Sequence, residues 1–145
     1  MDILSTTQAK AIMTQNVICV YPKTPLKELS EIFIENQISS APVVDEQQKV
    51  IGFVSQTDIV ELELHAKEDY LDARLEETGA YVQDIMVPEI VTAYETDSLA
   101  GIIDKMCTER LHRLIIVNQE QQVAGIITTM DVMCYLRKTY LERTA

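Results

Sequence analysis

Basic residues are scarce in this sequence of 145 residues, which has 12 Lys and Arg against 23 Asp and Glu and a formal net charge of -11. Duplex nucleic acid and anionic membranes attract proteins that have a surplus of positive charge. The composition therefore argues against both as partners bound through a general electrostatic field. An anionic ligand would need a site with its own local arrangement of hydrogen-bond donors.

Long apolar runs are also lacking, since none approaches the roughly 18 residues of a membrane-spanning helix. The opening MDILSTTQAK does not show the basic and then apolar order of a secretory signal. Only four glycines and four prolines are present, which leaves little room for disorder. We expect a chain that folds as one compact entity in the cytoplasm.

Cysteine and histidine are too few to suggest a metal site. Cys19, Cys107 and Cys134 are odd in number and lie in apolar patterns, which predicts buried thiols rather than a disulfide framework. His65 and His112 form no H-x-x-x-H pair, and no C-x-x-C is present. A P-loop, a G-x-G-x-x-G motif and a nucleophile paired with a base are absent as well. We expect no metal, no catalysis and no tightly bound cofactor.

What the sequence does contain is one pattern written twice, because residues 10–63 match residues 83–136 without a gap. The stretch GFVSQTD at 52–58 recurs as GIITTMD at 125–131. Nine pairs of positions are identical: Ile12/Ile85, Met13/Met86, Tyr21/Tyr94, Leu26/Leu99, Val44/Val117, Gln48/Gln121, Val50/Val123, Gly52/Gly125 and Asp58/Asp131.

Each copy predicts the element order β-α-β-β-α, and hence an α+β fold. Short β-branched runs at 16–20 and 89–93 predict the first strands. Thr24 and Asp97 are the expected N-caps of the helices that follow. Two apolar runs joined by a polar turn then predict a hairpin in each copy, followed by a second helix.

The first helix of each copy has an apolar face. Leu26–Phe33 and Leu99–Met106 carry apolar residues at the three and four spacing of a helix. These faces exceed what one small sheet can obviously cover. We therefore expect two chains to share them in a homodimer.

The repeated heptad G-x-x-[ST]-x-x-D allows two interpretations. Ser55 with Asp58, and Thr128 with Asp131, have the spacing of a capping box in which Asp replaces Glu, and a cap alone would explain them. Alternatively, the free amides of the helix N-terminus bind a phosphate, while the carboxylate accepts hydrogen bonds from two ribose hydroxyls. The preceding glycine favours the ligand, because a cap does not need it and a ligand could approach the strand there.

The shared order of these motifs resembles a tandem pair of CBS domains, the module named after cystathionine beta-synthase. The resemblance rests on IMT and IMV at the openings, SSAPVVD and HRLIIVN before the hairpins, and the two heptads. It implies two pseudo-symmetric repeats, at 8–66 and 81–138, packed sheet to sheet with flanking helices as one Bateman module. The linker at 67–80 is charged and lacks proline, so we expect a helical extension and a turn at Gly79.

In that family each pair of repeats has two clefts that commonly bind adenosine-containing ligands. The resemblance implies that Asp58 and Asp131 hold ribose hydroxyls and that Ser55 and Thr128 lie at the phosphates. The first cleft would contain Thr128 and Asp131 together with Thr14, Val17, Ser39, Ser40, Ala41 and Pro42. The second cleft would contain Ser55 and Asp58 together with Val87, Ile90, His112, Arg113 and Leu114.

The two clefts are not expected to be equal, because Ser39 and Ser40 of the first copy correspond to His112 and Arg113 of the second. Arginine forms charge-assisted, forked hydrogen bonds with phosphate, whereas serine offers a neutral hydroxyl. We expect the second cleft to prefer the more highly phosphorylated ligand. The alternatives are a surface ion pair for Arg113 and a structural role for His112.

The resulting expectation is a non-catalytic regulatory module that binds an adenosine nucleotide, AMP, ADP or ATP, and signals to a separate effector protein. One alternative is a protein-interaction or oligomerisation scaffold whose clefts are empty. Another is a module that binds S-adenosylmethionine or another adenosyl ligand, and a third is an enzyme that acts on a nucleotide.

Overall fold

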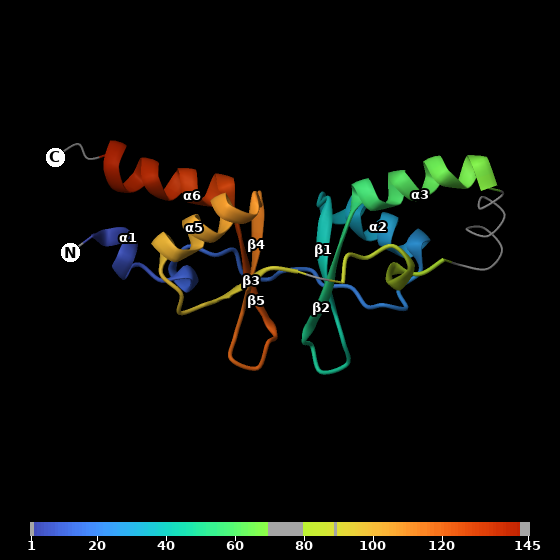
Figure 1. Ribbon diagram of the computed structural model, residues 1–145, viewed down its shortest axis with the longest axis horizontal. Helices are drawn as coiled ribbons and strands as arrows, with labels where there is room; N and C mark the ends of the chain where they lie inside the picture. Colours follow the sequence, from blue (N-terminus) through green and yellow to red (C-terminus); the bar gives the residue numbers. More distant parts are fainter. Residues whose placement is uncertain (1, 70–79, 89, 143–145) are drawn as a thin grey trace. The chain divides into compact units, whose positions relative to one another are not determined.

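The computed structural model describes residues 2–69, 80–88 and 90–142 (Figure 1). The chain divides into two compact units, which we describe separately. Unit 1 consists of Met1–Val17 and Val91–Ala145, and unit 2 is the continuous segment Ile18–Ile90. The predicted turn at Gly79 and most of the predicted linker lie outside the described residues.

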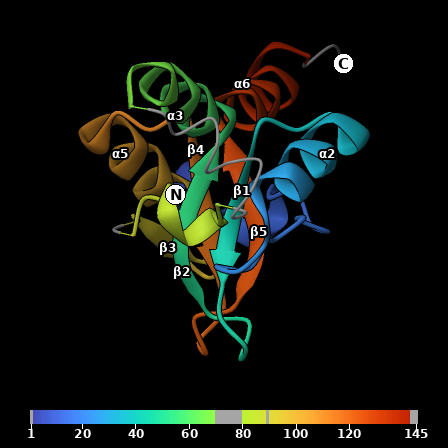
Figure 2. The same ribbon diagram turned by 90° about the vertical axis from the view of Figure 1, so that its right-hand side faces the viewer.

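Unit 2 is built on an antiparallel hairpin. Its elements are α2 (Leu26–Asn36), β1 (Ser40–Val44), β2 (Val50–Ser55), α3 (Gln56–Asp69) and the short helix η2 (Val82–Asp84). The register of the hairpin runs from Ser40 opposite Ser55 to Val43 opposite Gly52. Helix α3 begins where β2 ends, and Figure 2 shows the hairpin turn at the opposite end of the strands.

Unit 1 has the same hairpin with one more strand. Its elements are α1 (Ile3–Thr6), η1 (Ala9–Ala11), β3 (Thr92–Tyr94), α5 (Leu99–Glu109), β4 (Arg113–Val117), β5 (Val123–Thr128), α6 (Thr129–Leu136) and the π-helical turn η3 (Arg137–Leu141). The strand order is β3-β4-β5, with β3 parallel to β4 and β4 antiparallel to β5. The mixed architecture of helices and two sheets confirms the predicted α+β fold class.

The first strand of each copy is shorter than predicted. In the second copy only β3 at Thr92–Tyr94 is paired as a strand. In the first copy the expected strand at 16–20 is a single parallel bridge between Val20 and Val43. Asn16 lies in the left-handed region with φ 59° and so interrupts an extended conformation.

The expected N-caps are also displaced by one residue. Thr24 and Asp97 instead close the turns before the helices, where Thr24 Oγ1 accepts from the Tyr21 amide at 3.0 Å and Asp97 Oδ2 accepts from the Tyr94 amide at 2.9 Å. The cap of α5 is Ser98, whose hydroxyl accepts from the Gly101 amide at 3.1 Å. A polar side chain before a helix can serve the preceding turn as well as the cap, so the sequence pattern could not separate the two.

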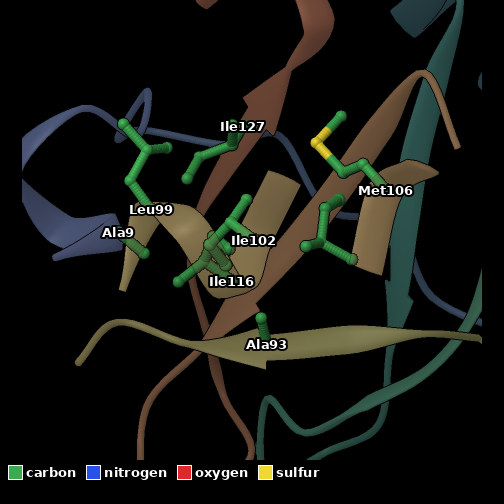
Figure 3. Close-up of a cluster of buried hydrophobic side chains, with 8 residues drawn as sticks. Ala9, Ala93, Leu99, Ile102, Met106, Ile116 and Ile127 are labelled. Atoms are coloured by element: carbon green, nitrogen blue, oxygen red, sulfur yellow. The ribbon is translucent and has the colours of Figure 1, made fainter. Parts of the chain in front are cut away.

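The predicted apolar helix faces fill the core of their own unit. Leu26, Leu29 and Phe33 are buried in unit 2, against β1 and β2. Figure 3 shows the corresponding cluster of unit 1, in which Leu99, Ile102 and Met106 of α5 lie with residues of the strands. These faces therefore leave no apolar excess for a second chain, and the reason given above for a homodimer is wrong.

Each unit also contains an opening segment that belongs, by sequence, to the other repeat. Ala9 in unit 1 is fully buried, and its amide donates to the Asp97 carbonyl at 2.8 Å. Val82 in unit 2 is equally buried and donates to the Thr24 carbonyl at 2.9 Å. The two copies have thus exchanged their openings, so a sequence repeat and a compact unit do not coincide.

The three cysteines are free thiols that differ in exposure. No disulfide forms among the three cysteines, all of which the structure describes, and Cys107 and Cys134 are exposed rather than buried as expected. They occupy the outer faces of α5 and α6, which the local apolar pattern does not reveal. Cys19 is partly buried, and this burial raises the pKa of its thiol.

Among the described residues no helix is long and apolar enough to cross a bilayer.

Candidate adenosyl-ligand sites

Both heptads form capping boxes at the junction between a strand and a helix. In unit 1 the Thr128 amide donates to Asp131 Oδ2 at 2.9 Å, and the Asp131 amide donates to Thr128 Oγ1 at 3.1 Å. In unit 2 the Ser55 amide donates to Asp58 Oδ2 at 2.8 Å, and the Asp58 amide donates to Ser55 Oγ at 3.3 Å. The cap interpretation of these residues is therefore realised in the structure.

A cap does not use the full capacity of the carboxylate. Each bond that Asp58 and Asp131 accept from the capping residue ends on Oδ2. An ionised carboxylate has about four acceptor positions on its two oxygens. Both side chains are only half-buried, so they can serve as a cap and accept hydrogen bonds from a ligand at the same time.

The glycines of the heptads have a structural reason of their own. A Cβ on Gly125 would lie 2.6 Å from Met13 Sδ and 2.9 Å from the Thr14 carbonyl oxygen. A Cβ on Gly52 would lie 2.9 Å from Met86 Sδ and 3.0 Å from the Val87 carbonyl oxygen. An opening segment, rather than a ligand, approaches each strand here. The glycines therefore do not favour a ligand over a cap.

The opening segments are held against the hairpins by reciprocal backbone bonds. Thr14 donates to the Ile126 carbonyl at 2.8 Å and accepts from the Ile126 amide at 3.0 Å. Val87 makes the equivalent pair with Phe53 at 2.8 and 3.0 Å. These bonds occupy the amides of Thr14 and Val87, whereas each carbonyl keeps a second lone pair. The side chain of Thr14 is exposed, and that of Val87 presents an apolar surface.

The segments before the hairpins lie beside the capping box of their own repeat. In unit 2 the Ser39 carbonyl accepts from the Gln56 amide at 2.8 Å, and Ser40 lies opposite Ser55. In unit 1 the His112 carbonyl accepts from the Thr129 amide at 2.9 Å.

Arg113 lies directly opposite Thr128 in the antiparallel pair β4-β5. Side chains at such opposed positions are close neighbours on one face of a sheet. Arg113 therefore lies beside the capping box of its own unit, whereas the resemblance assigns it to the second cleft, with Ser55 and Asp58.

Several predicted site residues are also core residues. Ala41 and Leu114 are at most 1% exposed, and Pro42 is buried. Their side chains pack inside their own unit. Val17 and Ile90, at the ends of the two opening segments, are half-buried. Each of these residues is described within its own unit, and the assignment of Ser39–Pro42 to the first cleft and of His112–Leu114 to the second remains a prediction.

The pairs Gln48/Gln121 and Tyr21/Tyr94 are identical in the two copies, but the sequence does not reveal their structural role. Gln48 and Gln121 adopt left-handed conformations in the hairpin turns, both with φ 66°. Their Nε2 groups donate to the hydroxyls of Tyr21 at 2.9 Å and Tyr94 at 2.8 Å. Each tyrosine therefore fastens the hairpin turn of its unit, as each opening methionine covers the glycine.

Metal-ligating histidine, cysteine and carboxylate side chains do not cluster in the part of the chain that the structure describes. Within the described part of the chain, no group of three or more His, Cys, Asp or Glu side chains could hold a metal ion.

A family model for the CBS domain matches residues 9–65 and 82–138. The chain belongs to the CBS domain family. A curated CBS relative is the gamma-3 subunit of the 5'-AMP-activated protein kinase of Homo sapiens, 24% identical over 119 residues, which are 82% of this chain and 24% of that protein. The chain thus spans about a quarter of the length of the curated relatives it matches first.

Two solved CBS structures show the same fold. CBSX2, a CBS-pair protein from Arabidopsis thaliana, was crystallised in complex with AMP; it is 21% identical, has a TM-score of 0.78, and the match covers 92% of this chain and 98% of that one. The CBS domain pair of protein MJ0100 was crystallised with 5'-methylthioadenosine and S-adenosyl-L-methionine. It is 22% identical, has a TM-score of 0.73, and the match covers 92% and 98% of the two chains.

Proposed function

We propose that this CBS pair is a non-catalytic regulatory module that binds adenosine-containing nucleotides of the AMP, ADP and ATP class and signals to an effector protein. The observation that carries the proposal is the doubled capping box with a half-buried aspartate. In each unit a carboxylate with spare acceptor capacity stands at the N-terminus of a helix. That combination suits a ribose diol next to a phosphate.

Further residues would complete the sites in named roles. The hydroxyls of Ser55 and Thr128 would lie at the phosphates, and Val17 and Ile90 would flank the adenine. Arg113 would give the highly phosphorylated ligands a charged partner. The complex of CBSX2 with AMP supports this choice of ligand class, because the two chains share the fold.

The alternative ligand is S-adenosylmethionine or another adenosyl compound, which the MJ0100 complex supports in the same way. A scaffold with empty sites is the second alternative, and the capping role of both heptads supports it. Ligand-free protein, prepared by unfolding and refolding, allows three possibilities to be distinguished: an adenosine nucleotide, another adenosyl ligand and empty sites. Thermal unfolding would be followed with AMP, ADP, ATP, S-adenosylmethionine and adenosine.

A ligand that binds only the folded state adds RT ln(1 + [L]/Kd), which is about 2.7 kcal/mol at a hundredfold excess over Kd. We expect the midpoint temperature to rise by several degrees with at least one phosphorylated ligand. A rise with S-adenosylmethionine alone would support the alternative ligand. Unchanged curves with all five compounds would contradict the proposal and leave the scaffold.

Asparagine substitutions test the carboxylates directly. Asp58→Asn and Asp131→Asn keep an oxygen that can cap the helix, but they remove the charge that strengthens hydrogen bonds to ribose. Bonds to charged groups contribute about 1.5–3 kcal/mol, so we expect each substitution to weaken one binding event by about ten- to a hundredfold in calorimetry.

Matched controls for these variants exist in both units. Asp84 Oδ2 accepts from the Tyr81 amide at 2.8 Å in unit 2, and Asp97 Oδ2 accepts from the Tyr94 amide at 2.9 Å in unit 1. Both aspartates close a local backbone turn, and neither is predicted to touch a ligand. Asp84→Asn and Asp97→Asn should lower stability as the site variants do, yet leave the affinities unchanged. Equal losses of affinity in controls and site variants would assign the heptads to capping alone.

The module is also proposed to act in the cytoplasm as a homodimer with an effector protein. Support for a dimer comes from exposed apolar side chains on the second helix of each hairpin unit, among them Leu64 on α3 and Met133 on α6, each 62% exposed. Light scattering at micromolar concentration tests the dimer, since the chain mass is 16.4 kDa. A mass of one chain, with and without nucleotide, would contradict it.

A further inference from the structure

Sulfur-bearing side chains gather in the first turns of helix α6. The sequence contains six methionines and three cysteines, and three of these residues, Met130, Met133 and Cys134, follow one another as M-x-x-M-C. All three are exposed, Met130 by 66% and Met133 by 62%. The opposite side of α6, with Val132 and Tyr135, packs on the core of unit 1. The three sulfur atoms therefore do not serve the core of their own unit.

The other described sulfur-bearing side chains have different surroundings. Met13 and Met86 cover the heptad glycines, and Met106 is buried in the core of unit 1. Cys19 is partly buried. Cys107 is exposed on α5, but none of the residues three or four positions away from it carries sulfur. Within the described residues, only 130–134 place three sulfur atoms on one exposed helix surface.

The helix directs these three side chains into the same space. Met130 precedes Met133 and Cys134 by three and four residues, spacings at which Cβ atoms on a helix are about 5–6 Å apart. Helical side chains lean toward the N-terminus, so the two later residues point back toward the turn that carries Met130. All three line one hollow of about 580 Å³. The unbranched methionine side chains can adjust their sulfur atoms to a common ligand there.

The rest of the hollow is mostly apolar, because its other lining residues are Leu136, Arg137, Tyr140 and Leu141. None of these lining residues, all of which the structure describes, is a carboxylate. Asp131 stands between the two methionines in the sequence, but its Oδ2 accepts from the Thr128 amide at 2.9 Å in the capping box. Arg137 is paired with Glu142 at 3.2 Å, which offsets its charge. The hollow therefore offers soft sulfur ligands rather than hard oxygen ligands.

The first copy of the repeat does not have this cluster. The positions that correspond to Met130, Met133 and Cys134 are Thr57, Val60 and Glu61, on and around the first turns of α3. Helix α3 follows the same kind of capping box without any sulfur at these places. The shared scaffold therefore does not require the cluster, which distinguishes the second copy from the first.

We propose that Met130, Met133 and Cys134 bind a soft monovalent metal ion, Cu(I), through two thioethers and one thiolate. Thioether and thiolate ligands select Cu(I), whereas hard divalent ions such as Mg²⁺ and Ca²⁺ prefer oxygen. Binding replaces the thiol proton of Cys134, which passes to solvent. Copper stays in its +1 state, so the step needs no oxidant or reductant. One positive charge meets one thiolate, and the neutral complex suits the apolar lining.

The site is independent of the nucleotide function and of the proposed homodimer. All three ligands come from one helix of one chain, so a second copy is not required. The same exposed side chains also support the homodimer, and leucine substitutions separate the two roles. Leucine keeps the apolar surface and nearly the volume of methionine, but it removes the sulfur.

Competition with a Cu(I) chelator under anaerobic conditions tests the site. Titration of the reduced protein with Cu(I) in the presence of bicinchoninate gives the stoichiometry and the affinity. We expect one Cu(I) per chain, and X-ray absorption at the copper edge should show sulfur ligands only. Residues that merely orient metal ligands already contribute about ten- to a hundredfold in affinity.

Two variants remove the ligands themselves. Cys134→Ser, which removes the anionic ligand, should therefore weaken binding by at least about a hundredfold. Met130→Leu with Met133→Leu should weaken it by at least about tenfold. Melting curves would show that both variants are folded, which is expected because all three positions are exposed.

Cys107→Ser is the matched control, because it removes an exposed thiol that has no neighbouring thioether on its helix surface. It should leave the Cu(I) affinity unchanged. Equal losses in Cys107→Ser and Cys134→Ser would overturn the site, as would binding that ignores the two leucines. One Cu(I) shared by two chains, or nitrogen and oxygen ligands at the copper edge, would also contradict the proposal. None of these outcomes bears on nucleotide binding.

Discussion

The hairpin of β1 and β2 and the hairpin of β4 and β5 are the same scaffold with different surroundings. Both have a glycine under an opening methionine, a glutamine in the turn bonded to a tyrosine, and a hydroxyl and an aspartate that cap the next helix. These features account for most of the positions that are identical in the two copies. Most positions that are identical in the two copies therefore hold the backbone of the hairpin and of the adjoining segments in place.

The differences lie on the surfaces around that scaffold. Ser40 corresponds to Arg113 beside the capping boxes, and Glu61 corresponds to Cys134 on the outer helix faces. A functional difference between the repeats must arise from such positions, since the scaffold is shared. The comparison thus separates residues that keep the fold from residues that distinguish one half from the other.

Among the shared features of the scaffold, substitution of the heptad glycines should lower stability most. In Gly125→Ala the new methyl group would meet the Met13 side chain and the Thr14 carbonyl, and the backbone cannot move without loss of the bonds to Ile126. We expect the free energy of unfolding to fall by about 1–3 kcal/mol, and by somewhat less for Gly52→Ala, where the contacts are longer. Urea denaturation measures both.

Gly101→Ala is the matched control for these substitutions. Its methyl group would meet only Ser98 Oγ, at 3.3 Å, inside helix α5. Alanine is about 0.5–1 kcal/mol better than glycine within a helix, so stability should change little or rise. A loss at Gly101 equal to the loss at Gly125 would show that the opening segment is not the cause.

Nucleotides of different charge test whether the difference between Ser40 and Arg113 makes the two binding events unequal. If Arg113 serves phosphate, Arg113→Ala should weaken one ATP or ADP binding event by about ten- to a hundredfold and leave adenosine binding nearly unchanged. Calorimetry of Arg113→Ala combined with Asp58→Asn or Asp131→Asn identifies which event is affected. The resemblance assigns it to the event that Asp58→Asn weakens, and weakening of the other event would assign the arginine to its own unit. No change in either event would leave it as a surface residue.

The bonds between tyrosine and glutamine should contribute equally in the two units. Tyr21→Phe and Tyr94→Phe remove hydroxyls that accept bonds of similar length at exposed positions. A single neutral hydrogen bond contributes about 0.5–1.5 kcal/mol, and we expect the lower end of that range in each case. Chemical denaturation that shows a large loss in only one variant would contradict the equivalence of the two turns.

Alkylation distinguishes the thiols without any change in stability. Cys107 and Cys134 are exposed, whereas partial burial of Cys19 limits reagent access and raises its thiol pKa. The thiolate is the reactive form, so Cys19 should react last, and its lag should shrink as pH rises. Mass spectrometry of the partly alkylated chain measures the order. Early modification of Cys19 at neutral pH would contradict its burial.

The sequence was sufficient for the helices, the hairpins and the capping boxes of the heptads, because these depend on residues close together in the chain. Spacing alone predicts the apolar helix face of Leu26, Leu29 and Phe33. The outward direction of Cys134 was not predictable in this way. It depends on which side of α6 the core occupies, and that is decided by residues distant in the chain.

The heptad glycines show the same limit at the site. The pattern G-x-x-[ST]-x-x-D was recognised correctly, but the reason for Gly125 is the approach of Met13, more than a hundred positions away in the chain. Identity of both residues in the two copies was visible from the start. Only the structure connects them, because pairing across the repeats cannot be read from either repeat alone.

The exchanged opening segments bear on how this chain can be divided. A fragment cut to the first match of the family model, 9–65, would retain Gly52 but lose the segment with Met86 that covers it. It would also carry Met13 with no strand to receive it. A fragment that keeps either glycine covered by its opening methionine must therefore include residues from both family matches.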